Sequence, residues 1–167
     1  TTVGINGFMQ KIASLIARRE IRKNGEKTPS QLLAELSFGS YNKKFKPNRT
    51  DYDWLSLNRE NVDAYIEDPL CGFTCSSGFY RDLFYGIQFA SDYENLQHIP
   101  HDFPMLFLSG QNDPVGGMGK EVAQIVQLTK KAGAENVDLV LYPLLRHEIL
   151  NEANRVLVYR DVVRFLE

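Results

Sequence analysis

The region spanning residues 104–147 constrains the fold of this chain more than any other. Met105–Leu108 is an unbroken apolar run, and Ser109–Pro114 follows it with glycine, asparagine, aspartate and proline. An apolar run that ends in such turn residues predicts a strand buried on both faces, as in a parallel sheet. Asp113 would then lie in the loop just past the carboxyl end of the strand, where open α/β sheets bind their ligands.

The pattern continues with a helix, a second strand and a second polar loop. Lys120–Lys131 has the apolar spacing of an amphipathic helix, and Gly133 favours its end. Val137–Tyr142 is predicted as a second buried strand, and His147 lies in the loop after it. Because such crossovers are right-handed, both loops are expected at the same end of adjacent parallel strands.

The rest of the chain is predicted to be helical. Residues 5–90 hold several short helices and no strand, and the first of these helices covers Phe8–Arg22. Thr28–Gln31 has the pattern of a capping box with proline at the first helical position. A final turn and helix are expected from about Asn151. The expected buried residues of that helix are Val156, Tyr159, Val162, Val163 and Leu166.

Asp113 and His147 together are two thirds of a nucleophilic triad. In a triad the aspartate accepts the proton on one imidazole nitrogen, and the other nitrogen acts as general base for a hydroxyl. Taken separately, Asp113 also fits an ordinary turn residue before proline, and His147 fits a helix-start residue or a satisfied surface histidine. Their placement at neighbouring strand ends, with the acid first in the chain, favours the triad.

Several strings in the chain resemble one known family. Leu106–Gly116 and Arg146–Glu152 resemble the acid and histidine motifs of the α/β-hydrolase family of lysophospholipases and monoacylglycerol lipases, the serine aminopeptidase-like hydrolases. Asp51–Ser56 and Asp68–Phe73 resemble the cap region of that family. The resemblance implies a serine hydrolase of carboxylic esters, acting in lipid metabolism on lysophospholipid or monoacylglycerol-like substrates without a cofactor. Leu144-Leu145 depart from the smaller residues usual before Arg-His-Glu.

The nucleophile of that family sits on a Gly-x-Ser-x-Gly elbow, and no such pentapeptide occurs in these 167 residues. The nearest string, Thr74–Gly78, begins with threonine and follows no buried strand. Ser76 and Ser77 are therefore interpreted as N-cap candidates for the next helix. We expect the nucleophile and the oxyanion hole to lie before Thr1, and the 167-residue chain alone to be inactive.

The expected fold class is α/β, the C-terminal part of an α/β-hydrolase fold preceded by a helical cap. Residues 1–95 would form the cap or lid insertion, with Thr1–Gly7 as the exit from a preceding strand. Residues 96–167 would form the C-terminal βαβα part, which carries the catalytic Asp113 and His147. Because two strands alone make a marginal sheet, the missing N-terminal part of the core is the expected partner.

Charge is unevenly distributed along the chain. Residues 1–50 carry ten Lys/Arg and three Asp/Glu, whereas residues 51–167 carry nine Lys/Arg and eighteen Asp/Glu. A basic segment is either a solvated surface or a site for an anionic partner. The alternative to a hydrolase is therefore a non-catalytic binding module that associates with a partner or an anionic membrane through this basic third. Nucleic acid is not expected, because no recognised motif accompanies the aromatic and basic residues of 40–58.

Cysteine, histidine and hydropathy patterns exclude other classes. Cys71 and Cys75 lack the further ligands of a structural zinc site and the numbers of a disulfide framework, so reduced thiols in a cytoplasmic enzyme are expected. His98 and His101 lie near Asp102 without a third clear ligand, so no metal is expected. No apolar run approaches the ~18 residues of a membrane span, which leaves peripheral contact as the expected form of membrane association.

Overall fold

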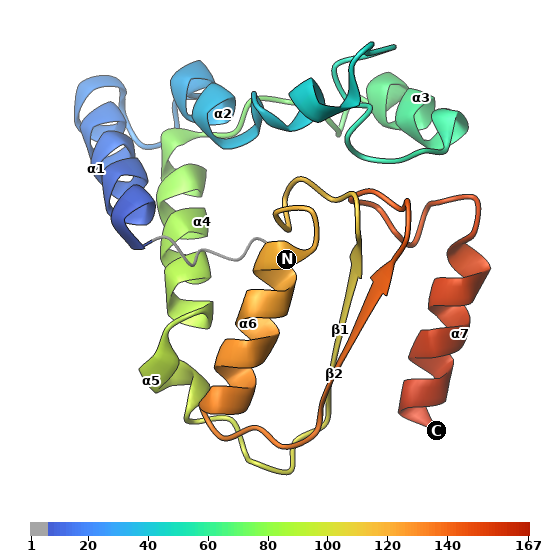
Figure 1. Ribbon diagram of the computed structural model, residues 1–167. Helices are drawn as coiled ribbons and strands as arrows, with labels where there is room; N and C mark the ends of the chain where they lie inside the picture. Colours follow the sequence, from blue (N-terminus) through green and yellow to red (C-terminus); the bar gives the residue numbers. More distant parts are fainter. Residues whose placement is uncertain (1–6) are drawn as a thin grey trace.

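The computed structural model describes residues 7–167, and the side chains from residue 11 onward. It shows a small parallel sheet with a helix on each face. Some of the N-terminal helices lie across one end of the sheet, and the others lie beside one of the two covering helices (Figure 1). The strand exit expected over Thr1–Gly7 lies outside the described residues, apart from Gly7, where the first helix begins.

Within residues 7–167 the sheet consists of two adjacent parallel strands, β1 (Met105–Gly110) and β2 (Val137–Tyr142). Each of the six residues of β1 pairs in order with one residue of β2. Both strands lie where the apolar runs predicted them, and α6 (Lys120–Lys131) forms the crossover between them. The loops that follow the two strands therefore lie at the same edge of the sheet.

α6 covers one face of this sheet with the apolar residues that its spacing predicted. Val122, Ile125 and Val126 are all buried. Val126 packs against Val137 at the start of β2, and Ile125 packs against Leu96. Leu96 thus lies on the core side of the expected domain boundary between residues 95 and 96, and that boundary stays a prediction.

α7 (Arg155–Leu166) covers the opposite face of the sheet but buries less than its sequence predicted. Val158 is fully buried and packs against Tyr142 of β2. Val156 is 69% exposed. The expectation of burial is also wrong for Tyr159, Val163 and Leu166, which are exposed, and Val162 is half-buried. Val158 is thus the one buried residue of α7, and most of the other apolar positions of this helix remain exposed in the described part of the chain.

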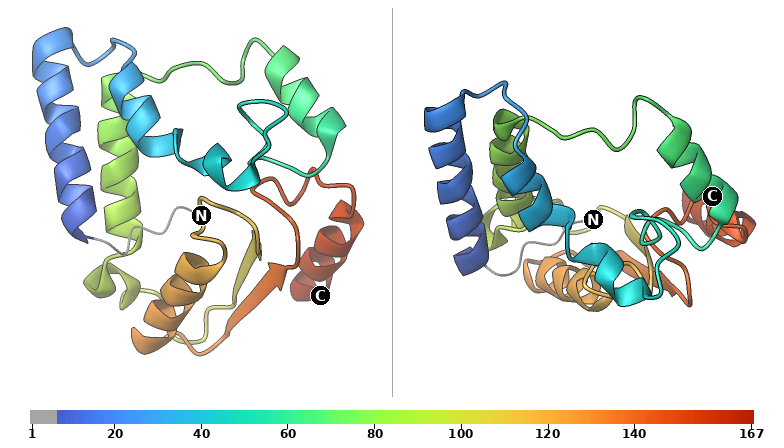
Figure 2. Two further views of the ribbon diagram at one scale, coloured as in Figure 1. Left: turned by 45° about the horizontal axis from the view of Figure 1, so that its top comes forward. Right: turned by 90° about the horizontal axis from the view of Figure 1, so that it is seen from above.

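Between residues 7 and 96, six helical segments precede the sheet. They are α1 (Gly7–Asn24), α2 (Gln31–Phe38), the 3₁₀ helix η1 (Tyr41–Phe45), α3 (Arg59–Glu67), α4 (Ser77–Ala90) and α5 (Tyr93–Leu96). Ala17 of α1 and Tyr80 of α4 share a buried cluster with Leu33 of α2. The chain from α2 to α3 passes over the strand-end loops of the sheet (Figures 1 and 2).

Serine hydroxyls cap the first turn of two of these helices. Ser30 Oγ accepts the backbone N–H of Leu33, so the capping box predicted with Thr28 as the cap is wrong by two residues. The Thr28 hydroxyl donates instead to the Asn24 carbonyl at the end of α1, at 2.6 Å. Ser76 accepts a backbone N–H at the start of α4, which confirms its predicted capping role.

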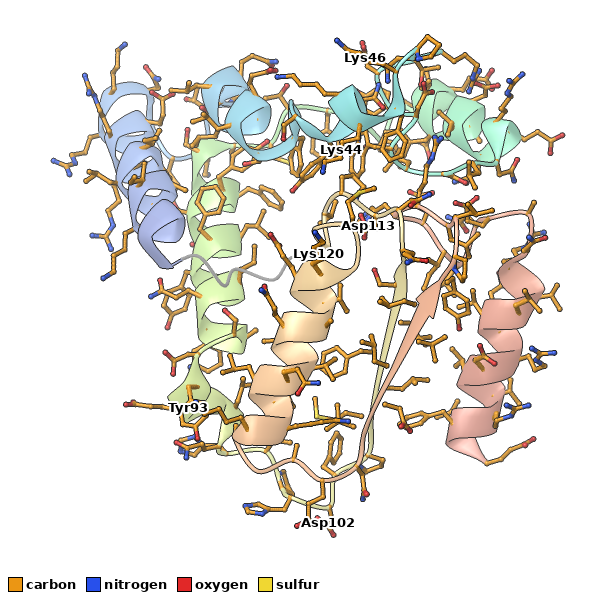
Figure 3. The ribbon with its side chains drawn as sticks, viewed as in Figure 1. Lys44, Lys46, Tyr93, Asp102, Asp113 and Lys120 are labelled. Atoms are coloured by element: carbon orange, nitrogen blue, oxygen red, sulfur yellow. The ribbon has the colours of Figure 1, made fainter. Side chains whose placement is uncertain are left out.

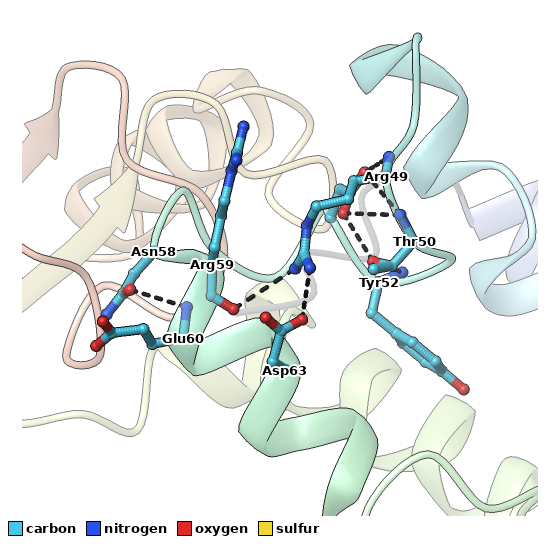
Figure 4. A network of polar contacts seen from close by, with 8 residues as sticks. Arg49, Thr50, Tyr52, Asn58, Arg59, Glu60 and Asp63 are labelled. Atoms are coloured by element: carbon cyan, nitrogen blue, oxygen red, sulfur yellow. Dashed lines mark hydrogen bonds and ion pairs between the residues drawn. The ribbon is translucent and has the colours of Figure 1, made fainter.

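The loop between η1 and α3 is held by two carboxylates. Asp53 accepts the backbone N–H of Arg49 at 2.6 Å and the Thr50 hydroxyl hydrogen at 2.7 Å. The Arg49 guanidinium donates to Asp63 of α3 at 2.6 Å (Figure 4). Burial alone would raise the pKa of Asp53, but the hydrogen bonds from Thr50 and Arg49 outweigh burial, and the pKa is lowered. These contacts position the next residue, Trp54.

Candidate active site

Asp113 and His147 lie side by side, in the Asp loop (residues 111–119) and the His loop (residues 143–154). Asp113 Oδ2 is 3.1 Å from His147 Nδ1. Asp113 is 3% exposed, and its Oδ1 accepts the N–H of Val115 at 2.8 Å. Figure 3 shows Asp113 beyond the end of β1, toward the N-terminal helices. Because a carboxylate only accepts hydrogen bonds, Nδ1 carries the hydrogen and Nε2 is left as an acceptor.

The structure thus brings together the two residues singled out in the sequence, and their catalytic role stays a prediction. The Asn112 N–H donates to the Leu145 carbonyl at 2.9 Å, and the Asn112 amide donates to the Leu144 carbonyl at 3.3 Å. A Cβ at Gly110 would collide with the carbonyl oxygens of Leu145 and Arg146. The close approach of the Asp loop and the His loop therefore depends on the glycine that ends β1.

The two leucines that open the His loop have different environments. Leu144 has a φ of +68°, a backbone region that glycine occupies without strain, and its side chain is exposed. Leu145 is buried and packs against Tyr142 and Val158. The departure from smaller residues at these positions therefore adds backbone strain at Leu144 and core packing at Leu145.

Trp54 covers the imidazole. The ring centroids of Trp54 and His147 are 5.2 Å apart, with an angle of 44° between the ring planes, and Trp54 also packs against Tyr41. Burial raises the pKa of the Tyr41 hydroxyl, and the carboxylates of Asp113 and Glu121 raise it further. The aromatic residues of 40–58, Trp54 among them, were expected to pack on the core as part of a cap loop, but no local pattern marks a specific contact across ninety-three positions. The cap-like string that contains it was the available signal.

Arg146 connects the His loop to the N-terminal helices. Its guanidinium carbon lies 4.2 Å from the centroid of the Phe45 ring. The same group donates to the backbone carbonyls of Asp53 and Ser56. Burial lowers the pKa of Arg146, while the carboxylates of Asp53 and Glu152 act in the opposite direction. Arg146, which directly precedes His147 in the chain, is therefore held by η1 and by the segment that follows it. The sequence did not predict this contact.

A cavity of about 820 Å³ opens among the N-terminal helices. Its lining includes the aromatic side chains of Phe38, Tyr52, Trp54 and Tyr80. Clefts of this size are typical of small-molecule sites. Because Trp54 contacts His147 as well, one side chain belongs both to the wall of the cavity and to the surroundings of the imidazole.

Other candidate groups from the sequence have structural partners or raised pKa values. Cys71 and Cys75 are free thiols, and burial raises the pKa of each. Ser77 donates its hydroxyl hydrogen to the Thr28 carbonyl at 3.3 Å. Residues 7–167 contain no group of three or more His, Cys, Asp or Glu side chains that could hold a metal ion. None of the helices in this part of the chain is long and apolar enough to cross a bilayer.

The chain is similar to known proteins in family and in fold. A family profile described as serine aminopeptidase S33 matches residues 8–154. The carboxyl esterase of Bacillus coagulans, solved with glycerol, superposes with a TM-score of 0.85 and 21% identity, over 94% of this chain and 51% of the esterase. A monoglyceride lipase of Saccharomyces cerevisiae, solved with a substrate analog, superposes with a TM-score of 0.65 and 19% identity, over 96% of this chain and 49% of the lipase.

A third similar structure is the monoacylglycerol lipase of Paleococcus ferrophilus, with a TM-score of 0.58 and 21% identity, over 92% of this chain and 64% of the lipase. A comparison with curated protein sequences gave no match. The chain spans about half the length of the esterase and of the yeast lipase. The similar structures show the fold, and the profile match over most of the chain shows that this chain belongs to the serine aminopeptidase S33 family of α/β-hydrolases.

Proposed function

We propose that this chain is the C-terminal part of a serine hydrolase of carboxylic esters, with Asp113 and His147 as its acid and base. The observation that carries the proposal is the 3.1 Å contact between Asp113 Oδ2 and His147 Nδ1 at the carboxyl edge of a parallel sheet. The family match and the esterase and lipase structures support the hydrolysis of carboxylic esters.

In this mechanism a serine from the missing N-terminal part of the core attacks the ester carbonyl. His147 Nε2 takes the serine proton and passes it to the leaving alcohol, and water then releases the acyl group from the serine in the same way. Asp113 holds the Nδ1–H in place and stabilises the imidazolium. The twofold greater length of the esterase and of the yeast lipase supports a nucleophile and an oxyanion hole outside these residues.

The N-terminal helices are proposed as a cap or lid whose cavity receives the acyl chain. Phe38, Tyr52 and Trp54 give the cavity an aromatic lining, which suits an acyl group. Two of the similar structures are monoacylglycerol or monoglyceride lipases, which favours a monoacylglycerol or a lysophospholipid as substrate. The free thiols of Cys71 and Cys75 support a cytoplasmic location.

The test uses the full protein that contains this chain and follows hydrolysis of p-nitrophenyl esters, monoacylglycerol and lysophosphatidylcholine. We expect turnover by the wild type and a loss of about 10³-fold or more in His147→Ala, since a triad without its histidine keeps only residual catalysis. His98→Ala is the matched control, because His98 is exposed and its ring contacts the Glu94 carbonyl. Equal turnover by both variants would contradict the proposal.

A second assay locates the nucleophile. The isolated 167-residue chain is expected not to hydrolyse a short p-nitrophenyl ester, since the serine would be missing. Turnover by this chain that disappears in His147→Ala would place a competent nucleophile within these residues. That result would overturn the proposal of a serine in the N-terminal part.

A second candidate function is contact with an anionic membrane, with or without catalysis. A groove of about 510 Å³ between α1 and α4 is lined by Lys11 and Arg18 beside the exposed side chains of Leu15 and Tyr85. Neighbouring cationic and apolar side chains suit an anionic lipid surface. Sedimentation of the full protein with anionic vesicles at low and high salt tests this candidate. Salt-sensitive binding without ester hydrolysis would favour a binding module.

A further inference from the structure

The mechanism above gives no role to Glu152, the least exposed carboxylate among the described residues. Glu152 lies in the His loop, five residues after His147, and is 1% exposed. Its Oε1 accepts the backbone N–H of Arg146 at 3.0 Å. Its Oε2 accepts the Ser56 hydroxyl hydrogen at 2.8 Å and the N–H of Leu57 at 3.0 Å. A buried charge needs such partners, so this carboxylate is built into the structure rather than placed at its surface.

The donors around Glu152 come from two distant parts of the chain. Ser56, Leu57 and Asn58 lie in the turn before α3, whereas Arg146 lies in the His loop. Every one of these groups donates, and a carboxylate can accept on both of its oxygens. A glutamine in this place would turn its NH₂ group toward at least one backbone N–H. The site therefore selects a carboxylate.

Contacts on both sides of the imidazole lead to the same segment, residues 53–61. The N–H of Glu148 donates to the Leu55 carbonyl at 2.8 Å, and the Glu148 carboxylate accepts from the Asn61 amide at 2.5 Å. On the other side, the Arg146 guanidinium donates to carbonyls of the same segment. The backbone on each side of His147 is thus attached to the chain before and within α3.

We propose that Glu152 is a positioning residue for His147. By joining the backbone at Arg146 to the turn at residues 56–58, it keeps the His loop and the cap in one rigid unit and holds Nε2 in the direction of the substrate ester. This inference rests on the proposed ester hydrolase. Glu152 does not line the 820 Å³ cavity, so its loss should affect the chemical step and not the binding of substrate.

The experiment compares Glu152→Gln with Glu135→Gln in the full protein. Glu135 is exposed before β2, so its variant removes a negative charge away from the site. For Glu152→Gln we expect kcat to fall about 10- to 100-fold, the effect of a misplacement of about 1 Å, with KM within about twofold of wild type. The downfield proton NMR signal of His147 Nδ1–H should shift in Glu152→Gln and stay in place in Glu135→Gln.

A wild-type kcat together with an unshifted Nδ1–H signal in a folded Glu152→Gln variant would overturn the proposal. If that variant does not fold, Ser56→Ala decides, because it removes one donor and keeps the carboxylate. A loss of about threefold or more in kcat at unchanged KM supports the role of Glu152, because a loss of that size corresponds to the energy of one weak hydrogen bond. A wild-type kcat in Ser56→Ala overturns it. If the wild-type protein hydrolyses no ester, the proposed function fails, and the Nδ1–H signal alone tests the positioning of the imidazole.

Discussion

The indole of Trp54 packs on the imidazole of His147, although the two residues belong to different parts of the fold. Trp54 follows a loop that Asp53 holds through Arg49 and Thr50, and His147 follows the second strand of the sheet. The same indole lines the cavity among the N-terminal helices. A ligand that contacts Trp54 in that cavity would therefore be separated from the imidazole by this one side chain.

Replacing Trp54 should lower kcat/KM, and the loss should be greater when no aromatic ring is left at this position. Trp54→Ala is expected to lower kcat/KM about tenfold, because an aromatic pair contributes roughly 0.5–1.5 kcal/mol beyond its buried area and 1.4 kcal/mol is a factor of ten. Trp54→Phe keeps a ring against His147 and should lose less. Steady-state kinetics on monoacylglycerols of increasing chain length measure both variants. Equal losses in the two variants would show that the ring contact is not the cause.

Asp113→Asn should remove most of the activity and leave the fold intact. An asparagine amide at this position favours the wrong imidazole tautomer, and kcat should fall by about 10⁴-fold. Asp138→Asn is the control, because Asp138 is exposed near the start of β2, away from the carboxyl ends of the strands where Asp113 and His147 lie. A kcat for Asp113→Asn close to that of Asp138→Asn would show that Asp113 is a turn residue and not the acid of a triad.

Gly110→Ala and Gly86→Ala should change stability in opposite directions. The new Cβ at Gly110 would meet the backbone of the His loop, and such overpacking costs about 1–3 kcal/mol. Gly86 lies in α4, and beyond the neighbouring backbone of that helix no atom lies within 4 Å of the added Cβ, so alanine should stabilise this helix by about 0.5–1 kcal/mol. Urea unfolding of the two variants measures the difference. Unfolding midpoints that shift the same way would contradict the close approach at Gly110.

Leu144→Gly should stabilise the protein. The φ of +68° costs a leucine about 1–2 kcal/mol, and glycine would remove this strain. The greater conformational freedom of glycine in the unfolded chain opposes folding by only about 0.5–1 kcal/mol, so the net change should be stabilising. The exposed Leu144 side chain contributes little packing that could be lost. Thermal unfolding should show a melting temperature slightly above that of the wild type. A lower melting temperature would mean that the leucine side chain has a packing partner in the full protein.

Asp53 should make stability depend on pH in the acid range. Because hydrogen bonds lower the folded-state pKa of Asp53, its contribution is present above the unfolded pKa of about 3.9 and is lost as the pH falls through the lower folded value. Asp53→Asn should therefore be less stable than the wild type at pH 7, and the difference should narrow below about pH 4. Urea unfolding at a series of pH values measures it. If the difference in unfolding free energy between the wild type and Asp53→Asn stayed constant from pH 7 to pH 3, Asp53 would not be a source of pH-dependent stability.

Local sequence patterns were sufficient for most elements of the core. The bounds of α6 and β2 and the start of β1 follow from apolar spacing and turn residues, because these act over a few neighbouring positions. The end of β1 does not, since the strand continues through Ser109 and Gly110, which were predicted as turn residues. Asp113 and His147 could be predicted as neighbours since each directly follows a parallel strand. The start of α2 was misplaced because Thr28 and Ser30 both have the hydroxyl of a cap, and only the folded backbone shows that the Leu33 N–H meets Ser30.

By itself, the sequence determined the strands, the crossover helix and the two loops that meet at the sheet edge. The tertiary structure alone decided that Trp54 covers His147 and that Glu152 accepts from Ser56, because both contacts join residues more than ninety positions apart. It also decided how much of α7 is buried. Apolar spacing shows which helix positions can pack, whereas burial depends on what other parts of the chain lie against them.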